Sequence, residues 1–282
     1  MAPPTYGDLG RASRDIFGTG YHFGLIKLEL KTKTKDSVDI TAGGALNKDT
    51  GKVFGSLETK YKVKDYGIVF TEKWNTNNSL STEISIEDKL AKGLKLSLDT
   101  AFSPHSGKKT GRVKTQYKHE SIALNMDVNL DLGGPIINGS SVVGYNGWLA
   151  GYQMSFDTSK SKFTKNNFAV GFSTGDFVLH TNVNEGQQYC GSLYQKVNPE
   201  LETGIQLAWN AGSNSTRFEI GCKYSLANNA SVRAKVDNAS RVGLGYQQTL
   251  RDGVTLTMSA LIDGKNFNQG GHKLGLSLDL EA

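Results

Sequence analysis

The chain has 282 residues, with 32 Lys and Arg against 27 Asp and Glu, and a formal net charge of +5. This mild excess does not require a nucleic-acid partner, although it would favour anions in an enclosed polar space. The mean hydropathy is −0.39, and no apolar stretch approaches the length of a membrane helix. Membrane β-barrels are not excluded, because their strands alternate between apolar and polar residues and average to near neutral.

Residues 1–20 differ from the rest of the chain and form the first predicted unit. Apolar residues recur at three- and four-residue spacings from Thr5 to Thr19, which predicts an amphipathic helix of about four turns. The charged residues Arg11, Arg14 and Asp15 lie on its other side. Two glycines follow and are expected to act as a hinge. A helix packed on a core and a movable element both fit this pattern.

From about Leu25 to Leu280, apolar and polar side chains alternate almost without interruption. Successive side chains of a strand point to opposite faces, so residues 21–282 are predicted to form one all-β meander. Turn signals such as Asn146-Gly147 separate about nineteen segments, and short connections make neighbouring strands antiparallel. An odd number of strands requires the first and last to run parallel if the sheet closes.

The size of this sheet indicates which face is inside. Barrels of sixteen or more strands enclose an aqueous channel, so the charged face should line water and the apolar face should contact lipid. The sequence therefore predicts a transmembrane β-barrel, with two packed soluble sheets as the alternative. The basic residues expected on the lumen side are Lys27, Lys31, Lys33, Lys60, Lys62, Lys95, Arg112, Lys114, Lys118, Arg217 and Lys235.

Glu72 is an exception to the alternation. It shares the apolar, outward set of its strand with Phe70 and Trp74. A carboxyl group on the lipid face is energetically costly, and such residues are functional candidates by default. The alternative is a local bulge that turns this side chain inward.

The sequence shows no catalytic constellation. The five histidines are scattered without metal-ligand spacing, and the two cysteines, Cys190 and Cys222, form no framework. We therefore predict that the protein is not an enzyme and requires no cofactor.

Several long motifs resemble those of the voltage-dependent anion channels, the mitochondrial porins of eukaryotes. The motifs are GSLETKYKVKDYG, TEKWNT, GWLAGYQ, LHTNVN, AKVDNAS and DGKNFNQGGHKLGL, and the similarity extends over the whole chain. The resemblance implies a voltage-gated, weakly anion-selective diffusion pore of the mitochondrial outer membrane, which passes small ions and metabolites such as ATP, ADP and phosphate. It also implies that the N-terminal helix lies inside the pore and acts in gating. The mitochondrial protein-import pore, which shares the fold, and a soluble β-sandwich binding module are the alternatives.

The resemblance further implies weak nucleotide contacts and protein partners. A lysine pair associated with ATP corresponds to Arg11, which keeps the charge, and Thr19, which loses it. The glutamate that matches Glu72 faces lipid in the family and is linked to hexokinase docking and oligomer contacts. Other implied partners are the lipid bilayer, further copies of the chain and Bak/Bax-type apoptosis regulators, whereas no nucleic acid is expected. Stretches associated with NAD correspond to Arg241, Val242 and Gly243 and to Ser259, Ala260, Leu261, Ile262 and Asp263.

Overall fold

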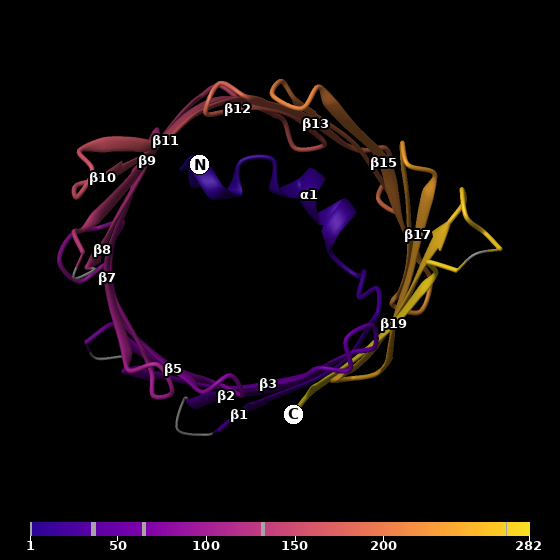
Figure 1. Cartoon of the computed structure of the whole chain (residues 1–282), viewed down its shortest axis with the longest axis horizontal. Helices are drawn as coiled ribbons and strands as arrows, with labels where there is room; N and C mark the ends of the chain where they lie inside the picture. The colour runs from indigo at the N-terminus through magenta and orange to yellow at the C-terminus, as the bar shows by residue number, and fades with distance from the viewer. Residues whose placement is uncertain (1, 35–37, 64–65, 131–132, 269) are drawn as a thin grey trace.

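The computed structural model describes residues 2–34, 38–63, 66–130, 133–268 and 270–282. In these ranges 19 strands form a single closed sheet, and the N-terminal segment, residues 2–24, lies inside the ring (Figure 1). The prediction of an all-β barrel with about nineteen strands and an internal helix is confirmed. The alternative of two packed sheets is excluded, because all the described strands belong to one sheet.

The strands are between 8 and 12 residues long. A tilted strand of about 9–11 residues crosses the hydrocarbon core of a bilayer, so these lengths match a membrane. In chain order the strands are β1 Leu25–Lys33, β2 Val38–Asn47, β3 Val53–Val63, β4 Ile68–Asn75, β5 Ser79–Glu87, β6 Leu94–Ser103, β7 Lys108–Lys118, β8 Ile122–Leu130, β9 Ile136–Tyr145, β10 Trp148–Asp157, β11 Lys162–Ser173, β12 Phe177–Asn184, β13 Gln188–Lys196, β14 Leu201–Asn210, β15 Ser215–Leu226, β16 Ala230–Asp237, β17 Arg241–Arg251, β18 Val254–Asp263 and β19 Lys273–Glu281.

The barrel closes between its first and last strands. β1 pairs with β19 in parallel, with Ile26 opposite Leu276 and Leu30 opposite Leu280, whereas the other neighbours in the sheet are antiparallel. Each strand therefore has a partner on both sides, and no edge exposes unpaired backbone N–H and C=O groups to lipid. The C-terminus lies beside β1 as a result (Figure 1).

Large apolar side chains lie on the outer surface of the barrel, the reverse of a water-soluble protein. Leu28 and Ile220 are each 50% exposed, and many other leucines, valines and aromatic residues are exposed alongside them. Buried apolar residues are few, and their main cluster lies where the N-terminal segment contacts the wall at β8–β11. The residues of this cluster are Leu9, Ala123, Val142 and Ala169.

The prediction of one four-turn helix from Thr5 to Thr19 is wrong. The structure has a 3₁₀ turn, η1 (Tyr6–Asp8), followed by a shorter helix, α1 (Arg11–Gly18). Gly10 lies between them with φ +68°, a left-handed conformation that cannot continue a right-handed helix. Among the described residues, no helix has both the length and the apolar character that crossing a membrane requires.

A lysine substitution on each face of one strand tests this orientation. Val113 of β7 is on the outer face, opposite Leu98 and Val128, whereas Gln116 shares the inner face with Lys114. Val113→Lys is expected to lower the free energy of unfolding by about 2–4 kcal/mol, because lysine at the lipid face near the middle of a bilayer is desolvated. Gln116→Lys, the matched control, is expected to change it little. Reversible denaturant unfolding in lipid vesicles measures both, and equal effects would contradict the orientation.

Candidate functional site

Helix α1 is docked on the inner wall through its apolar face. Ile16 and Phe17 are 1% and 6% exposed, and both contact Gly204 of β14 and Gly221 of β15, which are opposite one another in register. A Cβ atom at Gly221 would lie 3.0 Å from Phe17 Cε1 and 3.1 Å from Ile16 Cγ2. The absence of side chains at these two positions lets the helix approach the wall closely.

The turn before the helix contacts the wall in the same way. A Cβ atom at Gly151 of β10 would lie 2.8 Å from Leu9 Cδ1 and 2.9 Å from Tyr6 Cδ2. Gly10, at the break between η1 and α1, lies against the imidazole of His180 on β12. The break therefore allows Leu9 and Ile16 to be buried against different strands of the wall, which one straight helix would not do.

The charged residues of the predicted gating helix are bonded within the N-terminal segment. Arg11 is 68% exposed in its side chain and forms ion pairs with Asp8 at 3.5 Å and Asp15 at 3.7 Å. Arg14 donates hydrogen bonds to the carbonyl oxygens of Leu9, at 2.5 Å, and Gly7. Arg11 and Asp15 thus carry charge that faces the lumen, while Arg14 also joins η1 to α1.

The predicted hinge lies at Gly18 and Gly20, and residues 21–24, which come after it, follow the wall closely. The N–H of His22 donates to Ser259 Oγ at 3.0 Å, and the His22 carbonyl oxygen lies where a Cβ atom at Gly275 would be. The rings of Tyr21 and Phe23 are 5.3 Å apart. Burial raises the pKa of Tyr21 to about 12, so its hydroxyl is neutral at physiological pH. The segment that follows the predicted hinge is therefore attached to β18 and β19.

The strand register places all eleven predicted lumen residues on the inner face. The inward direction is fixed by the residues beneath the helix, since Gly221 is opposite Lys235, and the register of successive strand pairs carries it around the barrel, with shifts only at Ser155/Phe156 and Thr249/Arg251 among the described pairs. Several of these cations are paired with acids on the same face: Lys27 and Lys31 with Glu29, Lys62 with Asp39, Arg112 with Asp127, Lys114 with Asp99, and Arg217 with Glu219. The other five form no ion pair in the described part of the chain: Lys33, Lys60, Lys95, Lys118 and Lys235, of which Lys235 donates a hydrogen bond to the carbonyl oxygen of Phe17.

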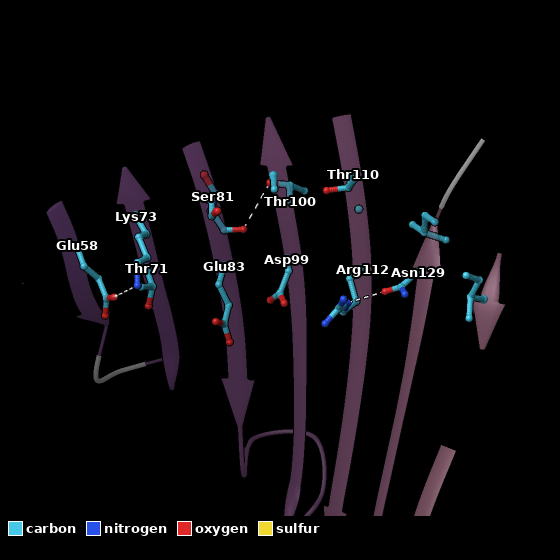
Figure 2. A pocket seen from close by; sticks show the side chains of 15 residues that line it. Glu58, Thr71, Lys73, Ser81, Glu83, Asp99, Thr100, Thr110, Arg112 and Asn129 are labelled. Atoms are coloured by element: carbon cyan, nitrogen blue, oxygen red, sulfur yellow. Dashed lines mark hydrogen bonds and ion pairs between the residues drawn. The ribbon is translucent and has the colours of Figure 1, made fainter. Parts of the chain in front are cut away.

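The wall that the helix leaves uncovered forms a shallow concave surface across β3–β9 (Figure 2). Its side chains carry charges of both signs. Lys73 lies 3.6 Å from Glu58, and Arg112 donates a 2.6 Å hydrogen bond to Asn129. Glu83 and Asp99 are directly opposite one another on β5 and β6. Alternation along the sequence puts Glu58 and Lys73 on the polar faces of their strands, but the eleven predicted lumen residues do not include them or Glu83.

Glu72 lies on the outer face of β4. Its register partners are Thr59 of β3 and Thr82 of β5, and the pairing of β4 with both neighbours is continuous. The alternative of an inward-turning bulge is excluded by this register. The carboxyl group is thus exposed on the face that the apolar side chains share.

The residues associated with nucleotides occupy two places. Arg11 and Thr19 lie at opposite ends of α1, roughly 12 Å apart at the rise of an α-helix. The two NAD-associated stretches are directly paired, with Arg241 opposite Asp263 and Gly243 opposite Leu261. Of their polar groups, Arg241 is ion-paired with Asp237 at 2.6 Å, and Ser259 accepts the hydrogen bond from His22. Val242, Ala260 and Ile262 have the outward register.

The described ranges contain no group of three or more His, Cys, Asp or Glu residues that could hold a metal ion. The site is instead a wide lumen with a polar, charged wall and a docked N-terminal segment. A closed sheet with an apolar exterior and such a lumen defines a membrane pore.

Comparison with known proteins identifies the family of this pore. The eukaryotic porin family profile matches residues 2–275. The non-selective voltage-gated ion channel VDAC2 of Xenopus laevis is 63% identical over 280 residues, which cover 99% of both chains. The voltage-dependent anion-selective channel of Drosophila melanogaster is 61% identical over 282 residues, which cover 100% of both. The chain therefore belongs to the eukaryotic porin family, a family of pores rather than enzymes, and its resemblance to voltage-dependent anion channels is confirmed.

A solved structure shares the architecture more distantly. A mutant of the Rh. blastica porin superposes with a TM-score of 0.51 at 12% identity, covering 80% of this chain and 96% of that one. This likeness shows the fold alone.

Filling the space beneath the helix tests its docking. Gly221→Val is expected to displace Ile16 and Phe17 and to speed exchange of the helical amides roughly ten- to hundredfold, since overpacking typically costs about 1–3 kcal/mol. Gly191→Val on β13 is the control, because a Cβ atom there meets nothing within 4 Å. Hydrogen exchange of residues 14–19, followed by mass spectrometry in detergent, measures the effect. Unchanged protection in Gly221→Val would contradict the docked arrangement.

Proposed function

We propose that this protein is a voltage-gated, weakly anion-selective diffusion pore of the mitochondrial outer membrane, passing small ions and metabolites such as ATP, ADP and phosphate. The observation that carries the proposal is the inner wall, on which Lys33, Lys60, Lys95 and Lys118 form no ion pair with another described residue. Such cations raise the local concentration of anions without holding any one of them. Conduction requires this combination of attraction and weak binding.

Only a modest preference for anions is expected. Most lumen cations are close to a carboxylate, as in the pairs Lys62–Asp39 and Lys114–Asp99, so their fields partly cancel. The names of the two relatives differ on this same property, because the Xenopus laevis channel is called non-selective and the Drosophila melanogaster channel anion-selective. A pore with mixed charges and a few unpaired lysines would have a selectivity between non-selective and strongly anion-selective.

Voltage gating is assigned to the N-terminal segment. It lies inside the lumen and carries the charges of Arg11, Arg14 and Asp15, on which a transmembrane field can act. One elementary charge that crosses the full potential contributes about 2.3 kcal/mol per 100 mV, so partial movement of a few charges suffices. Movement of this segment would also change the width of the channel.

Nucleotides and protein partners belong to the proposal as secondary interactions. We expect ATP to make weak contacts at Arg11, and NAD at the paired stretches of β17 and β18, where Arg241 and Gly243 face inward. Neither place has a phosphate-binding loop, and Thr19 contributes no charge. Glu72, exposed on the outer face, is the expected contact for hexokinase or for a second copy of the chain. The proposal also includes Bak/Bax-type apoptosis regulators as partners.

Single-channel recording of the purified protein in a planar bilayer tests the function. In a KCl gradient the open state should have a large conductance and a reversal potential that indicates anion preference. Voltage steps of either sign should reduce the conductance. A cation-preferring open state, or a conductance independent of voltage, would overturn the corresponding part of the proposal.

Charge changes on the inner wall should move the selectivity in both directions. Lys95→Glu reverses an unpaired lumen charge. It is expected to shift the reversal potential toward the equilibrium potential of the cation. Glu83→Gln removes an acid from the same wall and is expected to shift it toward that of anions. Both are measured in the same KCl gradient. Shifts of equal sign, or none, would contradict selectivity by lumen charge.

A further inference from the structure

We infer that Arg233 and Lys235 of β16 form a latch that holds the C-terminal end of α1 and sets the voltage at which the pore closes. The latch is defined by these two cations and the helix carbonyls they bind. This inference rests on the proposed voltage gating, and it assigns the docking strength of the segment to two particular residues. They are positioning residues, because they act on the helix and not on the permeating ion.

The latch binds carbonyl groups at the end of α1. That of Phe17 accepts no backbone hydrogen bond within the described part of the chain, and that of Asp15 also accepts from the N–H of Thr19 at 3.1 Å. The last four carbonyl groups of an α-helix have no partner within the helix, and α1 has only 8 residues. Arg233 Nη1 donates to the carbonyl oxygen of Asp15 at 3.2 Å, and Lys235 Nζ donates to that of Phe17 at 2.6 Å. Cations at this end of a helix also complement its dipole. The two side chains reach the same helix because residues two apart on a strand share a face.

Lys235 also joins the end of the helix to the segment that follows it. Its Nζ lies 4.5 Å from the centre of the Tyr21 ring and 5.5 Å from that of Phe23. An ammonium group near aromatic faces is attracted to them, more strongly where water is excluded. One lysine therefore contacts both sides of the predicted hinge, so bending there requires its contacts to change.

Other groups in the same interface oppose the docked state. Ser13 Oγ, Tyr21 Oη and Arg233 Nε are buried and have no hydrogen-bond partner among the described residues. Ser13 is 1% exposed, and Arg233 is 8% exposed. Burial of a polar group without a partner is unfavourable, and undocking into the aqueous lumen would hydrate all three. The interface thus contains hydrogen bonds that favour the docked helix and buried unpartnered groups that favour the undocked helix. A two-state element requires both.

The charges on which the field acts and the contacts that set the half-closure voltage belong to different parts of the structure. The field acts on the net charge that moves with the segment, while Arg233 and Lys235 belong to the wall. Weakening the latch should therefore move the half-closure voltage and leave the steepness of the voltage dependence unchanged. Lumen width in the open state should not change either.

Two pairs of substitutions with opposite expected effects test the latch in planar bilayers. Arg233→Gln and Lys235→Gln should each increase the closed-to-open ratio at a fixed voltage about tenfold, as expected for loss of a hydrogen bond from a charged group. Arg233→Lys should restore part of the wild-type threshold. Ser13→Ala and Tyr21→Phe remove buried unpartnered hydroxyl groups, so they should decrease the ratio a few-fold and require a higher voltage for closure.

Lys165→Gln is the matched control. Lys165 of β11 has the inward register, and it forms no hydrogen bond or ion pair within the described ranges. Its loss removes the same lumen charge without affecting α1. An equal shift in Lys165→Gln, or an unchanged half-closure voltage in all four test variants of a wild type that gates, would overturn the latch. A wild type that does not close at any voltage would instead refute the proposed gating itself.

Discussion

The closed hydrogen-bonding of the sheet is the constraint on which the rest of the structure depends. The bilayer interior supplies no water to pair with a bare strand edge, so a membrane sheet must return to its first strand. With 19 strands that return is possible only by parallel pairing of β1 with β19. The same ring is too wide for side chains to fill, which creates the lumen. The apolar exterior, the aqueous interior and the place for an internal segment all follow from this closure.

Closure of the sheet does not determine where the N-terminal segment docks in the lumen. Small residues beneath α1, above all Gly204 and Gly221, make a close docking surface for Ile16 and Phe17 on one part of the wall. The wall at β3–β9 keeps its charged side chains exposed to the lumen (Figure 2). The pore is therefore asymmetric around its axis, with an apolar contact on one side and mixed charge on the other.

Most of the barrel could be predicted from the sequence because strand alternation is a local signal. Lys27 and Lys31, and the outward position of Glu72, followed from counting by two along a single strand. The break at Gly10 could not be predicted, since a glycine is tolerated inside a helix and only the contacts of Leu9 and Tyr6 with β10 decide the break. The latch was also beyond sequence reasoning. Its two hydrogen bonds join residues 218 apart in the chain, and only barrel closure brings them together.

The central claim is that the apolar side chains of the strands face outward and the polar side chains face the lumen. Cysteine accessibility along one strand tests this claim most directly. Single cysteines would replace consecutive residues from 112 to 117 of β7, in a variant without Cys190 and Cys222, reconstituted in liposomes. The structure predicts that a water-soluble thiol reagent labels the even positions, and that a lipid-soluble reagent labels the odd ones. Uniform labelling by the water-soluble reagent, or the opposite alternation, would contradict the orientation on which this account of the pore depends.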